Sequence, residues 1–396
     1  MTEWKTYKLG DIADIQTGPF GSQLHNKDYA DEGSPIVTVE HLGNRHFTTQ
    51  NLPLVSDTDK ARLSKYILSE GDIVFSRVGS VDRCSYVSDK EVGWLFSGRC
   101  LRVRCNGEVY PLYIYYYFCL ESVKQYIRNV AVGATMPSIN TQIMSEIPIS
   151  LPPLEEQRRI AGILGAIDDK IENNRRINTN LELQAQALYK QWFVDNRKDD
   201  WEVGKVSDYY DITIGKTPPR KEKQWFSLNS QHTTWVSISD MGTCGMYISD
   251  SSEYLTADAV SRFNIKEVSP NTVLLSFKLT IGRVAISNGV MTTNEAIAHF
   301  NTEKDYLLEY TYLALKAYEF SNLGSTSSIA TAVNSKIIKA MRWIMPEERV
   351  LLDFHNLVSP IFRQIKNNIL ENEKLTTLRD TLLPKLMNGE IKLYKE

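Results

Sequence analysis

An internal repeat constrains the fold of this chain more than any other feature of its sequence. Five segments of the first half return in the second half in the same order. They are Trp4–Ile15 and Trp201–Ile212, Ile36–Val39 and Trp235–Ile238, Ile73–Ser76 and Val273–Ser276, Tyr113–Leu120 and Leu307–Ala314, and Ser138–Asn140 and Ala332–Asn334. A shared order of several matches indicates duplication, so we expect each half to build a similar fold.

Each half opens with a globular part and closes with a long helix. In the globular parts, short β-branched runs alternate with Gly, Pro, Asn and Asp, which is typical of strands and turns. A Tyr-rich helix near the end of each globular part is the main exception. Pro152, Pro153 and Pro346 mark the starts of the long helices. The sequence therefore predicts an α+β fold with two duplicated α/β domains at 1–152 and 199–345, long helices at 153–198 and 346–390, and a tail at 391–396.

Both long helices carry apolar residues at alternating spacings of three and four, the heptad pattern of paired helices. Two asparagines interrupt this heptad seam at the same place in each helix, and a buried Asn can fix register and orientation. We therefore predict an antiparallel coiled coil with approximate two-fold symmetry; the alternative is that each helix packs only on its own domain. The seam residues are Ile160, Leu164, Ile167, Ile171, Asn174, Asn178, Leu181, Leu188, Phe354, Val358, Ile361, Ile365, Asn368, Asn372, Leu375 and Leu382.

The composition is that of a water-soluble globular protein. The start of the chain has no signal pattern and the most apolar run, Tyr113–Leu120, is too short to cross a bilayer, which predicts a cytoplasmic protein without a membrane association. The five cysteines are odd in number and form no Cys-x-x-Cys pair, so we expect buried free thiols rather than disulfides or a zinc site. The six histidines are scattered, and no metal site is predicted.

Motifs of catalysis are missing from the sequence. Gly215-Lys216-Thr217 approaches a phosphate-binding loop, but Tyr210 stands where that motif requires its first Gly. The chain contains no Asn-Pro-Pro-[Tyr/Phe], His-Glu-x-x-His or Gly-x-Ser-x-Gly run. A net charge of −3 without a basic half disfavours a protein that holds nucleic acid unaided. Together these features favour a binding protein that works with partners.

Several runs resemble the specificity subunits of Type I restriction–modification enzymes. The most specific run is LPPLEEQRRIA at 151–161, and it is followed by IDDKIE at 167–172 and QWFVD at 191–195. The others are GPFGSQL at 18–24, SRVGS at 76–80, GATMPSIN at 133–140, IGKTPPR at 214–220, WVSISD at 235–240 and LLPKLMNGEI at 382–391. The resemblance covers nearly the whole chain. Lys216 stands where the family prefers Gly, and the stretch 223–233 is atypical, which leaves the recognised sequence undefined.

The resemblance implies that each domain is a target recognition domain that reads one half of a split, asymmetric site on double-stranded DNA. The helices would space the domains and bind two methyltransferase subunits that methylate adenine N6, and restriction/translocase subunits would add ATP-dependent cleavage. This chain would bind no cofactor, and S-adenosylmethionine, ATP and Mg²⁺ would belong to its partners. Two alternatives are a DNA-binding scaffold without partners and a nuclease or methyltransferase in its own right.

Base edges in the major groove are read by Arg, Lys, Asn, Gln, Ser and Thr on exposed loops. Such residues follow the opening Gly-rich turns, the matched central strands and the matched polar loops. The candidates are Gln23, His25, Lys27, Arg77, Arg83, Thr135, Ser138 and Asn140 in the first domain, and Lys216, Arg220, Lys221, Lys278, Arg283, Ser327, Ser328 and Asn334 in the second. Solvated surface charges are the alternative for the basic residues, and a structural turn is the alternative for Asn140 and Asn334. The tyrosines at 113–117 could stack on bases, but core packing is the favoured interpretation.

Overall fold

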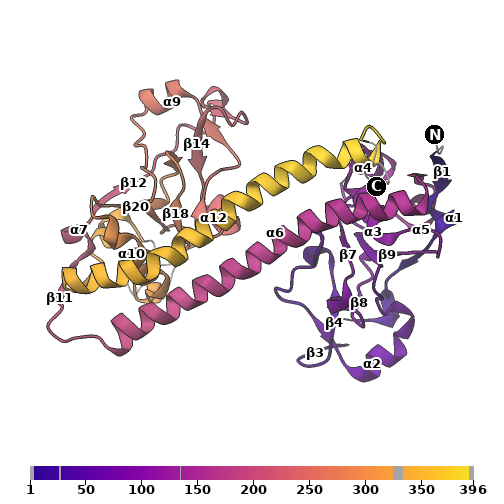
Figure 1. Ribbon diagram of the computed structural model, residues 1–396, viewed down its shortest axis with the longest axis horizontal. Helices are drawn as coiled ribbons and strands as arrows, with labels where there is room; N and C mark the ends of the chain where they lie inside the picture. Colours follow the sequence, from indigo (N-terminus) through magenta and orange to yellow (C-terminus); the bar gives the residue numbers. More distant parts are fainter. Residues whose placement is uncertain (1–3, 26–27, 134, 324–332, 392–396) are drawn as a thin grey trace. The chain divides into compact units, whose positions relative to one another are not determined.

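The computed structural model describes residues 4–25, 28–133, 135–323 and 333–391. Lys27, Ser327 and Ser328, three of the predicted DNA-contact residues, lie outside the described residues. The chain divides into unit 1, Met1–Ile171 with Lys374–Glu396, and unit 2, Glu172–Glu373 (Figure 1). We call the globular part of unit 1 lobe 1 (residues 4–151) and that of unit 2 lobe 2 (residues 201–345).

The described residues of lobe 1 form three small sheets. An antiparallel sheet has the strand order β2-β9-β6-β7, a second has the order β3-β5-β4-β8 with β4 parallel to β8, and β1 pairs with β10. The strands are β1 Lys5–Lys8, β2 Ala13–Thr17, β3 Tyr29–Ala30, β4 Ser34–Val37, β5 Leu54–Val55, β6 Ile73–Ser76, β7 Cys84–Tyr86, β8 Leu95–Phe96, β9 Cys100–Cys105 and β10 Pro148–Leu151. The helices are α1 Leu9–Ile12, α2 Asp57–Arg62, α3 Pro111–Cys119, α4 Glu121–Val130 and α5 Thr141–Ser145.

Lobe 2 repeats this topology. Its larger sheet, β12-β20-β17-β18, follows the antiparallel order of β2-β9-β6-β7 and gains β15 beside β18; the second sheet is β13-β16-β14-β19, and β11 pairs with β21. The strands are β11 Glu202–Lys205, β12 Asp211–Ile214, β13 Phe226–Ser227, β14 Thr233–Val236, β15 Tyr247–Ile248, β16 Tyr254–Leu255, β17 Val273–Ser276, β18 Val284–Ser287, β19 Thr292–Thr293, β20 Ile297–Asn301 and β21 Arg342–Met345. The helices are α7 Val206–Tyr209, α8 Ile238–Thr243, α9 Ala257–Arg262, α10 Leu308–Ala317 and α11 Ser335–Lys339.

The central strands β6 and β17 explain why the matched apolar runs are continuous. Every residue of both strands is buried. Ile73 and Phe75 face the core that contains α3, whereas Val74 faces the core formed with β4 and β8. Alternate side chains of a strand point to opposite faces, so a strand covered on both faces is apolar throughout. Lobe 2 uses Val273, Leu274 and Leu275 in the same way.

The Tyr-rich helices belong to these cores. Tyr113 and Tyr116 of α3 are almost fully buried, and Tyr310 and Tyr312 of α10 are buried in lobe 2. The preference for core packing over base stacking is therefore confirmed. Helix α4 was not predicted, because only Val123 and Ile127 of its ten residues are buried apolar side chains and its remaining sequence is polar.

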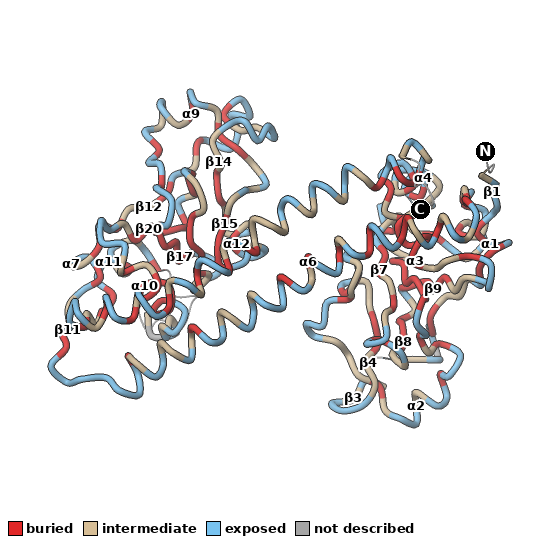
Figure 2. Tube along the Cα trace, in the orientation of Figure 1, coloured by how far each residue is buried: buried red, intermediate tan, exposed pale blue. Residues whose placement is uncertain are grey.

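The two long helices are α6, Leu154–Tyr189, and α12, Glu348–Met387; a π-helical turn, Lys190–Asp195, follows α6. None of the predicted seam residues is exposed, whereas the opposite faces of both helices are exposed to solvent (Figure 2). In unit 2, Asn174 Nδ2 donates to Asn372 Oδ1 at 2.9 Å and Asn368 Nδ2 donates to Asn178 Oδ1 at 2.7 Å. The residue number increases along α6 from one pair to the next while it decreases along α12, so the helices are antiparallel there.

The ends of these helices also pack on the lobes. Ile160 and Leu164 of α6 join Leu383 and Leu386 of α12 in the core of lobe 1. In unit 2, Phe354, Val358 and Ile365 enter the core of lobe 2. Helix pairing and packing on a domain, which the sequence presented as alternatives, therefore occur together in the same helices. No helix within the described ranges is long and apolar enough to cross a membrane.

Candidate nucleic-acid interface

Two hairpin loops of equal length follow the matched central strands. Residues 76–83 join β6 to β7 and residues 276–283 join β17 to β18. Ser76 N–H donates to Arg83 O at 2.9 Å, and Ser276 N–H donates to Arg283 O at 2.9 Å. The buried strands give each loop a rigid base, which is the usual setting of recognition loops.

Arg83 and Arg283 tie these hairpins to the rest of their lobes. The guanidinium of Arg83 donates to Leu42 O, and that of Arg283 donates to Ile238 O at 2.5 Å. Each guanidinium lies against a matched glycine: a Cβ at Gly43 or Gly242 would come within 2.7 or 2.4 Å of it. The glycines therefore make room for the arginines, whose donors face backbone carbonyls inside each lobe. DNA contact by this pair stays a prediction without support from these contacts.

In lobe 1, four loops meet around Arg77. Its backbone joins the loop at 132–139, because Ile139 N–H donates to Arg77 O at 3.0 Å and Gly79 N–H donates to Pro137 O at 2.8 Å. The Arg77 guanidinium donates to Gly98 O at 3.2 Å and lies over the exposed Phe20 ring, 5.9 Å from its centroid. The structure thus brings Arg77 and Ser138 together, and Thr135 belongs to the same loop as Ser138. Gln23 instead lies beside the end of α2, where Gln23 Oε1 accepts from Tyr66 OH and Gln23 O accepts from Arg62. His25 N–H donates to Asp28 Oδ2 at 2.7 Å.

Phe20 and Arg99 lie on the same surface and were missed by sequence reasoning. Phe20 is 63% exposed, which is unusual for a ring in a folded lobe. Arg99 is exposed, and its backbone carbonyl accepts from Arg77 N–H at 2.8 Å. The Gly-Pro-Phe run signals a turn that presents Phe20, but no local pattern distinguishes Arg99 from an ordinary surface arginine.

In lobe 2, the opening segment is held down by polar contacts. Lys216 Nζ donates to Phe263 O at 2.5 Å. Arg220 forms an ion pair with Glu253 at 2.7 Å, and its guanidinium is 4.4 and 4.5 Å from the ring centroids of Phe226 and Trp235. Both cations therefore have partners within the lobe. Lys221 and Lys278 are exposed, and neither forms an ion pair with any residue that the structure describes.

The matched asparagines Asn140 and Asn334 cap short helices. Asn140 Oδ1 accepts from Ile143 N–H at 2.8 Å at the start of α5. Asn334 Oδ1 accepts from Ile337 N–H at 3.1 Å at the start of α11. Asparagine is a preferred helix N-cap because its side chain satisfies a free backbone donor. These bonds show the structural role that the sequence offered as the alternative, and only the amide nitrogens are left for other contacts.

His299 is a buried residue that connects neighbouring strands of lobe 2 through hydrogen bonds. Its ring nitrogens are hydrogen-bonded to Thr213 Oγ1 at 2.9 Å and Thr293 Oγ1 at 2.7 Å, and Thr293 O accepts from Lys216 N–H. The side chain is fully buried, and desolvation together with nearby Lys266 lowers the pKa of His299 to about 4. The neutral ring therefore links β12, β19 and β20. The equivalent position of β9 in lobe 1 is Arg102, paired with Asp14.

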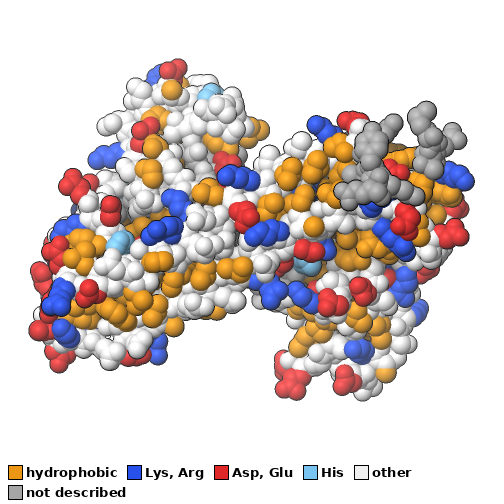
Figure 3. Space-filling view, in the orientation of Figure 1, with side chains coloured by type: hydrophobic (Ala, Val, Ile, Leu, Met, Phe, Trp, Pro, Cys, Tyr) orange, Lys and Arg blue, Asp and Glu red, His pale blue; other side chains and the backbone are white. Residues whose placement is uncertain are grey.

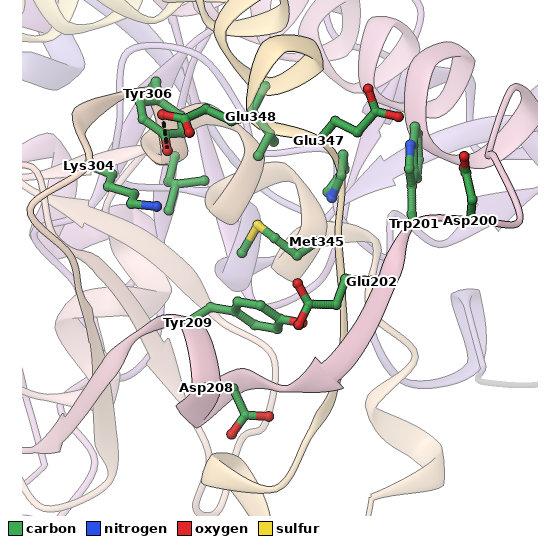
Figure 4. A pocket seen from close by; sticks show the side chains of 13 residues that line it. Asp200, Trp201, Glu202, Asp208, Tyr209, Lys304, Tyr306, Met345, Glu347 and Glu348 are labelled. Carbon is green, nitrogen blue, oxygen red and sulfur yellow. Dashed lines mark hydrogen bonds between the residues drawn. The ribbon is translucent and has the colours of Figure 1, made fainter.

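A pocket with a volume of about 580 Å³ opens in unit 2 (Figure 4), and no residue of the hairpin loop 276–283 lines it. Five of its thirteen lining residues are acidic and one, Lys304, is basic. Tyr306 OH donates to Glu348 Oε1 at 3.1 Å. The acidic residues are Asp200, Glu202, Asp208, Glu347 and Glu348. An excess of negative charge repels phosphate, so this pocket is unsuited to holding the DNA backbone.

The charged residues show no large basic patch on the face seen in Figure 3, where Lys and Arg are interspersed with Asp and Glu. Among the described residues, no three His, Cys, Asp or Glu side chains are grouped to hold a metal ion, and the five cysteines are free thiols. A surface of this kind binds nucleic acid weakly through charge alone, so any specificity rests on the loops.

The sequence of this chain is similar to those of known proteins. Residues 1–183 match the family described as Type I restriction modification DNA specificity domain. The chain is 23% identical to the Type I restriction enzyme HindI specificity subunit of Haemophilus influenzae, covering 99% of this chain and 100% of that protein. It is 26% identical to the MjaIX specificity subunit of Methanocaldococcus jannaschii, covering 99% and 94%.

Among solved structures, the S subunit of a Type-I restriction-modification system from M. genitalium has a similar fold. Its TM-score is 0.57 at 14% identity, and the match covers 97% of this chain and 96% of that one. The resemblance drawn from the sequence motifs is therefore confirmed: residues 1–183 match the DNA specificity domain family, and nearly the whole chain is similar to Type I restriction enzyme specificity subunits.

Proposed function

We propose that this chain reads a bipartite, asymmetric DNA target and positions methyltransferase and restriction subunits on it. The observation that carries this proposal is one loop scaffold built twice with different side chains. The hairpin runs from Ser76 to Arg83 in lobe 1 and from Ser276 to Arg283 in lobe 2, so the two loops have the same length. Their side chains differ: Phe277 stands at the place of Arg77, and His299 at the place of Arg102. Equal backbones with unequal side chains suit two half-sites of different sequence.

The long helices would set the distance between the half-sites. We infer that the halves arose by duplication and that α6 and α12 form an antiparallel coiled coil, which relates target recognition domains at 1–152 and 199–345 by approximate two-fold symmetry. The paired asparagines of unit 2 support this inference, because buried polar pairs fix the register of paired helices. Half-sites read from one face of the duplex would lie about one helical turn, roughly 34 Å, apart.

The outer faces of the helices are the proposed docking surface for two methyltransferase subunits. Leu183, Leu357 and Leu378 are 58%, 45% and 47% exposed there. Exposed apolar side chains on a long helix favour a protein partner. In this proposal the chain works in the cytoplasm and binds no cofactor; the partners hold S-adenosylmethionine, ATP and Mg²⁺, methylate adenine N6 and cleave DNA.

The test is methylation by purified components. The chain alone should neither transfer a methyl group from S-adenosylmethionine nor cut DNA with Mg²⁺, whereas the complex with its methyltransferase subunits should methylate a motif of two different half-sites separated by unread bases. Methyl transfer by the chain alone, or an uninterrupted motif, would contradict the proposal. Exchange of residues 1–152 for those of a relative should change one half-site and leave the other unchanged.

A further inference from the structure

Leu279 occupies the tip of the lobe 2 hairpin in an unusual state. Its side chain is 99% exposed, and its backbone has a φ of 61°. Thr280 N–H donates to Lys278 O at 2.7 Å, so Leu279 is the central residue of a three-residue turn. Three-residue turns with positive φ are rare and strained, and a branched side chain adds to the strain.

The equivalent loop of lobe 1 shows what the fold alone requires. Gly79 stands at the same place in a hairpin of the same length, with a φ of 75°. Glycine adopts this conformation without a steric cost. Because the Leu279 side chain is almost fully exposed, packing within the described part of the lobe does not offset its strain. Strain held in an otherwise well-fixed structure is characteristic of functional positions.

The tip stands on a rigid base. Val273–Phe277 are all buried, Phe277 N–H donates to Ala296 O at 2.9 Å, and Ser276 Oγ donates to Thr280 O at 2.6 Å. The flanking side chains of Lys278 and Thr280 are exposed. The hairpin thus presents one apolar group between an ammonium and a hydroxyl group, in a conformation set before any ligand binds.

We propose that Leu279 reads the C5-methyl group of a thymine in the half-site recognised by lobe 2; this inference rests on the proposed DNA-reading function. The thymine methyl is the apolar feature that base pairs display in the major groove. Lys278 is placed to contact a neighbouring phosphate, which positions the tip but carries no sequence information. Leu279 therefore contributes specificity that a search for polar side chains does not find.

The experiment uses the complex of the full chain with its methyltransferase subunits and the duplex defined by methylation mapping. Each thymine of the target is replaced in turn by deoxyuridine, which lacks only the methyl group. We expect one replacement in the lobe 2 half-site to weaken binding about fourfold, the effect of exposing one methylene-sized group. Leu279→Ala, which keeps a strained backbone, and Leu279→Gly, which relieves it, should both bind thymine and deoxyuridine duplexes equally.

Val290→Ala provides the matched control. Val290 is 57% exposed in lobe 2 but follows the other end of β18, so this variant should keep the wild-type preference for thymine. Leu279→Gly should also unfold at a higher temperature than Leu279→Ala, since glycine relieves the strain.

The outcomes separate the two levels of inference. Absence of a deoxyuridine effect anywhere in the lobe 2 half-site, or Leu279 variants that keep the wild-type preference, would overturn the role of Leu279 while the split target stands. If the variants bound the thymine duplex and the deoxyuridine duplex more weakly than the wild type by the same factor, thymine reading would be overturned. That result would indicate a wedge between base pairs instead. A complex without a split target would overturn the proposed function itself.

Discussion

The asparagine pair of the helix seam gives a prediction that can be worked out from the contacts. Asn368 is 5% exposed, and its Nδ2 donates to Asn178 Oδ1 at 2.7 Å; Asn178 Nδ2 donates onward to Ile365 O at 3.3 Å. Changing either asparagine to leucine leaves the other without its partner. Changing both removes the unpaired group and places apolar side chains on both sides of the seam.

The magnitude follows from the cost of an unpaired buried polar group. Each single variant should lose about 1–2 kcal/mol of unfolding free energy. The double variant Asn178→Leu/Asn368→Leu should be nearly as stable as the wild type or more stable, because replacing both partners removes the desolvation cost. The coupling free energy, which equals the sum of the two single losses when the double variant loses nothing, should therefore be about 2–4 kcal/mol, at or above the upper part of the range observed for residues in contact.

Urea unfolding followed by tryptophan fluorescence is a suitable assay. Five of the seven tryptophans, at 192, 201, 225, 235 and 343, belong to unit 2. Asn180 and Asn367 are exposed on the same helices, so their leucine variants serve as matched controls and should combine additively. Stability losses at Asn178 and Asn368 that add to within about 0.5 kcal/mol would refute the reasoning, since independent sites behave in that way.

Three further predictions concern the lobes and the helices. Burial lowers the pKa of His299 to about 4, so between pH 6.5 and 4 the unfolded chain binds a proton at this residue and the folded chain does not. The contribution of His299 to the unfolding free energy should therefore fall by about 3 kcal/mol from pH 6.5 to 4. His299→Gln should reduce this pH dependence in urea unfolding, and an unchanged dependence would contradict the prediction. Arg379→Ala removes the 2.8 Å partner of the 8% exposed Asp168 and should cost about 2 kcal/mol, with a smaller loss for Arg379→Lys; equal thermal unfolding of Arg379→Ala and the wild type would show that the pair contributes nothing. Inserting four residues after Asn178 adds about 6 Å of helix and should lengthen the unread spacer by one or two base pairs without changing the half-sites, whereas an active variant with the original spacer would show that something else sets the distance.

The sequence by itself determined the features that depend on periodicity. The repeat predicted two lobes of like topology, and the structure has matching strand orders in both. The spacing of apolar residues predicted which faces of α6 and α12 are covered, since side-chain polarity along a helix depends only on its pitch. The two asparagines in each seam were also visible, and their partners follow once the helices are antiparallel.

The residues that contact one another across the fold were decided by tertiary structure alone. Arg83 and Arg283 were candidates for base contact, yet their donors meet Leu42 O and Ile238 O, about forty residues away in sequence. Asn140 and Asn334 were recognised as a matched pair, but only the backbone shows that they cap helices. A side chain's hydrogen-bond partners depend on where distant segments meet, and local sequence does not specify that.

Leu279 is a residue that the sequence did not single out and that only the fold made a candidate. A leucine in a loop carries no signal of its own, because leucine is common on protein surfaces. Its positive φ follows from a hairpin closed by Ser276 and Arg283 and held by Ala296, so the strain exists only once those strands are in register. The sequence established that two loops correspond, and the fold decided that one of them holds a strained leucine where the other has a glycine.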